Sequence, residues 1–109
     1  MKCGEIWTLR DDRYASKARP VVIIQSDSIG EFDSVVLCLL TTFESTHIPT
    51  RVFISAGLLN GLKKDSYVMT EKIVTVAKVE LGEKIGALTK EQINLIKKQL
   101  AAILGISQQ

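Results

Sequence analysis

The chain has 109 residues, of which 46% are hydrophobic, 24% charged and 6% aromatic. This length fits one compact domain, residues 1–109, which can bury a core without a metal or a disulfide. Its 14 Lys and Arg residues against 12 Asp and Glu residues leave a net charge of +2, too small to indicate nucleic-acid binding by itself. The high hydrophobicity and low net charge also exclude extensive disorder.

The sequence contains no signal for a membrane, for secretion or for a metal. Its longest apolar run, residues 35–40, is far shorter than the about 20 residues of a membrane span. Residues 1–5 lack the apolar segment of a secretory signal. Cys3 and Cys38 have no CxxC spacing, and His47 is the single histidine, so we expect no metal site. We therefore expect a cytoplasmic protein with reduced thiols and no cofactor.

The first half of the chain predicts short strands separated by turns. Residues 5–9 are β-prone and follow a glycine, whereas residues 10–18 are polar and predict a loop. Residues 19–25 begin with Arg-Pro and continue with four β-branched residues, a pattern typical of a strand buried on both faces. Turn-forming residues fill 26–33, and residues 35–40 then predict a second such strand.

The middle of the chain predicts further strands with polar faces. Residues 50–55 alternate as in a strand with one wet face, and residues 56–65 hold two glycines, which indicates a turn or a single helical turn. Residues 66–70 and 72–78 complete the set, read as one long bent strand. Residues 81–84 predict a turn.

The C-terminal segment predicts a helix. Thr89 and Gln92 have the spacing of a capping box, and Gly105 provides a stop signal after the last apolar residue. The apolar residues between them share one helical face: Ile93, Ile96, Leu100, Ile103 and Leu104. Five or six strands and one terminal helix predict a small, mostly antiparallel barrel or curled sheet.

Three polar residues stand at or near the ends of these strands and suggest phosphoryl-transfer chemistry on RNA. Arg19 opens a strand and carries a fork of donors suited to a phosphate. Thr41 closes an apolar strand with a hydroxyl, and Glu71 is a carboxylate at the expected bend. The chain has no GxSxG, GxGxxG or P-loop motif, so serine-hydrolase, dinucleotide and P-loop sites are not expected.

Seven short blocks resemble the MazF/PemK family of toxin–antitoxin endoribonucleases, in the family's order and over nearly the whole chain. The blocks are GEIW (4–7), RPVVIIQSD (19–27), LTT (40–42), PTRV (49–52), GLKKDS (61–66), EKIVTVAK (71–78) and IGALT (85–89). The chain departs from the family where members often read RTIDK, because Val74 and Ala77 replace the arginine and the aspartate.

The resemblance implies a mostly β, SH3-like small barrel of the CcdB/MazF/PemK type, with about five to seven strands, a C-terminal helix and a homodimeric state. It implies a metal-independent, sequence-specific nuclease (an mRNA interferase) that cuts single-stranded RNA through attack by the 2′-hydroxyl, giving a cyclic phosphate. A cognate antitoxin, acidic and partly disordered, is expected to cover the RNA groove. The large apolar surface of two doubly buried strands and one helix also favours a symmetric dimer.

The resemblance places the catalytic roles on the same three residues. The arginine before proline is Arg19, the strand-end threonine is Thr41 with Thr42 as the one-residue alternative, and the acidic position is Glu71. Arg19 would stabilise the charge of the transition state, Thr41 would hold a nonbridging oxygen or a water, and Glu71 would take the 2′-hydroxyl proton. His47 is a weaker candidate for protonating the leaving group.

RNA binding is expected from basic, aromatic and polar side chains in or near loops. We assign it to Arg10, Arg13, Tyr14, Lys17, Thr42, Phe43 and His47. Two alternatives remain open: a CcdB-like gyrase poison, which would act through residues 104–109, and a noncatalytic SH3-like binding module.

Overall fold

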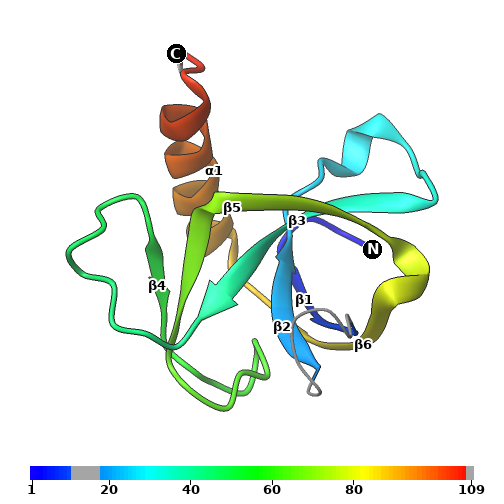
Figure 1. The fold of residues 1–109 in the computed structure, drawn as a ribbon, viewed down its shortest axis with the longest axis horizontal. Helices are drawn as coiled ribbons and strands as arrows, with labels where there is room; N and C mark the ends of the chain where they lie inside the picture. The colour runs from blue at the N-terminus through cyan, green and yellow to red at the C-terminus, as the bar shows by residue number, and fades with distance from the viewer. Residues whose placement is uncertain (11–17, 108–109) are drawn as a thin grey trace.

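The computed structural model describes residues 1–10 and 18–107. Within them the chain forms six strands, two short 3-10 helices and one α-helix (Figure 1). In chain order these elements are β1 (Glu5–Leu9), β2 (Arg19–Ile23), η1 (Asp27–Ile29), β3 (Ser34–Thr41), β4 (Val52–Ile54), β5 (Ser66–Ala77), η2 (Lys78–Glu80), β6 (Leu81–Ala87) and α1 (Lys90–Leu104).

The strands form a single antiparallel sheet in the order β4-β5-β3-β2-β1-β6. The two continuously apolar strands, β2 and β3, occupy the middle of the sheet, as their lack of a polar face predicts. β4 and β6 are the edges, and no pairing joins them within the described residues. The expected mostly β fold with a C-terminal helix is therefore confirmed, and the sheet is open rather than closed into a barrel.

β5 is one long strand with a bulge at the place where the sequence predicted a bend (Figure 1). Its pairing with β3 shifts between Leu39↔Met69 and Cys38↔Ile73, so that residues 70–72 have no direct partner on β3. Thr70 turns inward, where its Oγ1 donates a hydrogen bond of 2.7 Å to the carbonyl of Thr50. Glu71 is consequently exposed on the outside of the bend.

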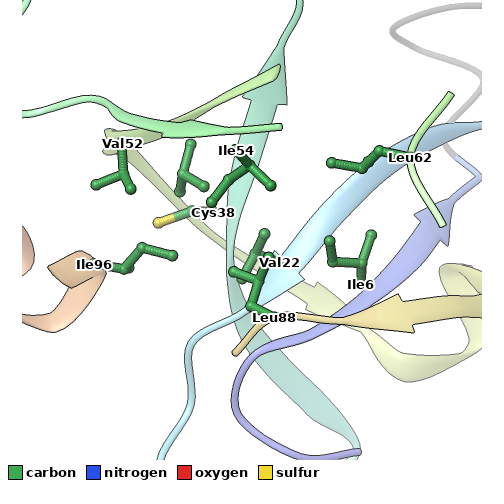
Figure 2. Packing of buried hydrophobic residues seen from close by; sticks show 9 residues of the cluster. Ile6, Val22, Cys38, Val52, Ile54, Leu62, Leu88 and Ile96 are labelled. Atoms are coloured by element: carbon green, nitrogen blue, oxygen red, sulfur yellow. The ribbon is translucent and has the colours of Figure 1, made fainter. Parts of the chain in front are cut away.

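Buried side chains form two clusters, because alternate residues of the central strands point to opposite faces of the sheet. Val22 and Cys38 belong to the first cluster, which Ile96 of α1 helps to cover (Figure 2). Val21 and Leu37 belong to the second cluster, on the other face. β2 is thus buried on both faces, as its run of β-branched residues predicted.

α1 begins and ends where the sequence predicted. The side chain of Thr89 accepts from the backbone of Gln92, the side chain of Gln92 accepts from the backbone of Thr89, and Gly105 adopts the left-handed conformation at the end. Ile96 belongs to the first cluster and Ile93 and Leu100 pack against it, whereas Leu104 remains 57% exposed. No helix in the described residues is both long and apolar enough to cross a membrane.

The prediction of a turn at residues 81–84 is wrong, since these residues begin strand β6. Leu81 pairs with Leu9 and Lys84 with Trp7 in the ladder with β1. The chain reverses earlier, in η2, and the register shift between Trp7 and Leu9 in the β1–β6 ladder accommodates the Leu-Gly-Glu-Lys sequence. Pairing with a distant strand therefore outweighs the local turn preference.

The side chain of Glu5 links the start of β1 to the N-terminal segment and to β6. Its Oε1 accepts from the backbone N–H of Lys2 at 3.0 Å and from Nε1 of Trp7 at 3.1 Å. Its Oε2 lies 3.0 Å from Nζ of Lys84 on β6. Burial alone would raise the pKa of Glu5, but these hydrogen bonds and the Lys84 charge lower it to about 2.

Replacing Glu5→Gln is expected to flatten the acid limb of the stability profile. Because the folded pKa lies below the ordinary value of 4.5, ionised Glu5 stabilises the fold above pH 4.5, and this contribution disappears as the pH falls towards about 2. Melting temperatures measured across this range check the prediction, with Glu83→Gln, an exposed carboxylate of β6, as the matched control. Identical acid limbs in the wild type and Glu5→Gln would contradict it.

Candidate active site

Arg19 and Thr41 meet at one end of the sheet. Val21 of β2 pairs with Leu39 of β3, and the same antiparallel register, continued for two residues, brings Arg19 opposite Thr41. Both residues line one cleft of about 280 Å³. Among the described residues, the lining of this cleft, called the Arg19 cleft below, is Arg19, Pro20, Leu40, Thr41, Thr42, Phe43 and Ser66.

Arg19 presents an exposed cation to this cleft. Pro20 favours an extended backbone at Arg19, which pairs with Leu9 of β1 as the first residue of β2. No carboxylate among the described residues lies within ion-pair distance of its guanidinium. Arginine stays protonated in proteins, so the site holds a fixed positive charge with a planar fork of donors.

Thr41 supplies a hydroxyl beside that charge. Its Oγ1 accepts a hydrogen bond of 3.2 Å from the backbone N–H of Phe43, which leaves the hydroxyl proton to donate. Thr42 also reaches the Arg19 cleft, but it lines as well a second groove of about 550 Å³ with Lys63 and Lys64. Of the two threonines that sequence reasoning left open, Thr41 is the one in register with Arg19.

Glu71 is engaged elsewhere, in an ion pair with Arg51. Nε of Arg51 lies 3.1 Å from Oε2 and 3.3 Å from Oε1, and Nη2 also contacts Oε2. Nη1 of Arg51 donates to the buried hydroxyl of Ser45 at 3.1 Å. The hydrogen bonds from Arg51 hold the pKa of Glu71 below its usual range, although burial opposes this. Glu71 does not line the Arg19 cleft.

The expected RNA-binding residues fall in several places. Phe43 lies at the Arg19 cleft with 81% of its surface exposed. His47 lies in an exposed turn after β3 and does not line that cleft. The side chain of Arg10 lies over Gly82 of β6, where an added Cβ would come within 3.1 Å of its Nε. Three further residues lie outside the described residues: Arg13, Tyr14 and Lys17.

Sequence reasoning missed two features of this region. Ser66 lines the Arg19 cleft, although a serine between Asp65 and Tyr67 carries no motif. Arg51 was expected as part of a strand with one wet face, whereas the structure makes it the partner of Glu71. The pairing of β5 with both β3 and β4 produces both features, and a correct strand order was the signal that would have revealed them.

Comparisons with known proteins show the family of the chain. Residues 2–104 match the family described as "PemK-like, MazF-like toxin of type II toxin-antitoxin system". The probable endoribonuclease MazF of Mycolicibacterium smegmatis is 31% identical over 108 residues, covering 98% of this chain and 99% of the relative. Endoribonuclease EndoA of Bacillus subtilis is 30% identical over 90 residues, covering 81% and 77% of the two chains.

Solved structures show the same fold. A mycobacterial endoribonuclease in complex with its cognate antitoxin superposes with a TM-score of 0.79 at 28% identity, covering 100% of this chain and 99% of that one. The toxin MazF-mt6 of Mycobacterium tuberculosis gives a TM-score of 0.80 at 25% identity, covering 95% and 99%. Since the family match spans nearly all of the sequence, the chain belongs to the PemK-like, MazF-like toxins of type II toxin–antitoxin systems.

Proposed function

We propose that the chain is the toxin of a toxin–antitoxin pair and an endoribonuclease that cuts single-stranded RNA, messenger RNA included, in the Arg19 cleft. The observation that carries this proposal is an exposed guanidinium in register with a strand-end hydroxyl, in a chain whose relatives are named endoribonucleases. We place its action in the cytoplasm, where messenger RNA is accessible.

The proposed reaction needs no metal ion. The 2′-hydroxyl loses its proton to water as its oxygen attacks the adjacent phosphorus. The bond to the 5′-oxygen of the next nucleotide breaks, this oxygen takes up a proton from water and leaves as a hydroxyl, and a 2′,3′-cyclic phosphate remains. Negative charge grows on the nonbridging oxygens as the new bond forms. A fixed cation beside them stabilises the transition state more than the ground state, which is the condition for rate acceleration.

Arg19 and Thr41 divide this task. The guanidinium of Arg19 binds the nonbridging oxygens through its planar fork of donors. The hydroxyl of Thr41, whose lone pair is occupied by the N–H of Phe43, donates its proton to one of the same oxygens. That backbone hydrogen bond fixes the hydroxyl oxygen of Thr41 before RNA binds, so the side chain loses little conformational freedom on binding.

Substrate binding is assigned to the residues around the cleft. The exposed ring of Phe43 is available for stacking on a base, and Thr42 offers a hydroxyl on the same loop. The roles of Arg10, Arg13, Tyr14, Lys17 and His47 in RNA binding stay predictions.

The cognate antitoxin is expected to bind the same surface. A related mycobacterial endoribonuclease has been solved in complex with its antitoxin. An acidic, partly disordered segment would complement Arg19 and order on binding, and it would exclude RNA by occupying the cleft.

Arg19→Ala is expected to lower the cleavage rate by about 100- to 1,000-fold, the usual cost of losing a donor that stabilises developing charge. Arg19→Lys keeps the charge but loses the fork, so we expect an intermediate rate. The measurement incubates each protein with a long RNA in EDTA and maps the cut ends, which should carry cyclic phosphates.

The matched control for Arg19 is Lys98→Ala, which removes a cation from the exposed face of α1. It should cut at the wild-type rate with an unchanged melting temperature. A folded Arg19→Ala protein that also cuts at the wild-type rate would remove Arg19 from the mechanism. Intact RNA with the wild-type protein would refute the endoribonuclease proposal itself.

Glu71 stays a predicted site residue, but its ion pair favours a positioning role through Arg51. A carboxylate whose pKa is held below its usual range is a weak base, and a true general base contributes about 100- to 10,000-fold. We therefore expect Glu71→Gln to cost less than about 100-fold and to leave the shape of the pH–rate profile unchanged. A larger loss, together with disappearance of the acidic limb, would identify Glu71 as the proton acceptor.

A homodimer is proposed from the apolar side chains that one chain leaves uncovered at its C-terminal helix. Leu95, Leu104 and Ile106 are 45%, 57% and 59% exposed. Sedimentation at micromolar concentration should show twice the 12.0 kDa of one chain. Leu104→Glu should shift the protein towards the monomer, and a wild-type protein that sediments only as a single chain would contradict the proposal.

A further inference from the structure

A row of four side chains crosses the sheet on the face of the Arg19 cleft. Thr41 of β3 pairs with Tyr67 of β5, and Tyr67 pairs with Phe53 of β4. Directly opposed residues of antiparallel strands point to the same face. With Arg19 opposite Thr41, the row therefore reads Arg19, Thr41, Tyr67 and Phe53, from the middle of the sheet to its edge.

The two aromatic rings at the edge form an ordered pair. Their centroids lie 5.3 Å apart with an interplanar angle of 61°, an edge-to-face arrangement. The hydroxyl of Tyr67 donates to Oε1 of Glu44 at 3.3 Å, which further fixes this ring. Phe53 nevertheless remains 51% exposed, so one large apolar ring surface has no cover within the described residues.

A shallow hollow of about 460 Å³ adjoins these rings. Its lining comes from β4, β5 and the loop that precedes β4: Ser45, Thr46, Ile48, Pro49, Arg51, Phe53 and Tyr67. Small-molecule sites in proteins commonly have about 300–1,000 Å³, so a hollow of this size accepts a group as large as a nucleobase.

The charge of this hollow differs from that of the Arg19 cleft. Arg51 is the single cation among the described residues of its lining, and both sides of its guanidinium are engaged, by Glu71 and by the hydroxyl of Ser45. A phosphate has little to gain from a cation that is already neutralised. An uncharged, flat ligand that stacks on Phe53 fits the hollow better.

The spacing of the four side chains suits an RNA strand that runs across the sheet from Arg19 to Phe53. Adjacent strands lie about 4.8 Å apart, so Phe53 is about 10 Å from Thr41 along the sheet. When the scissile phosphate is held at Arg19 and Thr41, the base of an adjacent nucleotide reaches Phe53 if it is unstacked from its neighbouring bases.

We propose that Phe53, supported by Tyr67, is a stacking platform for a base near the scissile linkage, and that it contributes to the choice of the RNA sequence that is cut. This inference rests on the proposed endoribonuclease activity. Exposed aromatic side chains bind splayed bases in this way in single-stranded RNA recognition.

The same observations argue against an acidic antitoxin segment as the occupant of the hollow. Such a segment needs cations without partners, and in the part of the chain that the structure describes the hollow offers only the Arg51–Glu71 pair. A second copy of the chain is the other occupant, and the oligomeric state of the variant tests it.

The test compares two phenylalanines of nearly equal exposure. Phe53→Val removes the platform and introduces a β-branched residue, which suits strand β4. Phe32→Val is the matched control, because Phe32 is 54% exposed and precedes β3 at the end opposite to Thr41. Both variants are assayed on a short RNA that contains the cleavage site mapped for the wild type.

In the same RNA, one nucleotide at a time on either side of the cut is made abasic, so that its base is missing. Loss of a stacked base costs about 5- to 150-fold in affinity or kcat/KM. We expect this loss at one position with the wild type and Phe32→Val, and no further loss at that position with Phe53→Val. A 2-aminopurine at that position should be quenched by the first two proteins and not by Phe53→Val.

Three results would overturn the inference. Equal abasic losses in Phe53→Val and the wild type would show that Phe53 does not hold a base. A change in sedimentation of Phe53→Val alone would assign Phe53 to the contact between copies. Absence of cleavage by the wild type would refute the proposed function and this inference with it, whereas cleavage with no effect of Phe53→Val refutes the inference alone.

Discussion

The pairing of β3 with its neighbours is the constraint on which the proposed site depends. Arg19 and Thr41 are 22 residues apart in the sequence, and the proposed site requires both side chains side by side. The β2–β3 register brings them to one end of the sheet, and the β3–β5 register places Tyr67 beside Thr41. Because one slipped residue would turn a strand's side chains to the other face, the buried residues of both clusters hold the site in register.

The bulge in β5 gives the two arginines different roles. By removing residues 70–72 from the ladder, it turns Glu71 outward to Arg51, whereas no ion pair among the described residues involves Arg19. One cation is therefore neutralised in a fixed position, and the other keeps its charge for a ligand. A guanidinium exposed at a cleft costs less free energy of folding than a buried one would, because solvent still reaches it.

Much of this fold follows from local patterns, and the site follows only in part. Three local patterns predicted their elements correctly: the β-branched run after Arg19, the apolar run before Thr41 and the Thr89 capping box. Each of these signals is carried by residues that are adjacent in the sequence. Residues 81–84 were mispredicted, since their strand exists only through pairing with β1. The partner of Glu71 was equally hidden, because Arg51 stands 20 residues away and approaches only through the β4–β5 pairing.

The residues proposed to act on the phosphate and the residue proposed to select the base lie on different strands of the sheet. Arg19 and Thr41 belong to the inner strands, where both backbone edges are paired and a change disturbs buried neighbours on either face. Phe53 lies on the short edge strand β4, where its exposed ring can be exchanged without moving the register of β3. A fold built this way can alter the base that it holds while the charge and the hydroxyl that act on the phosphate stay in place.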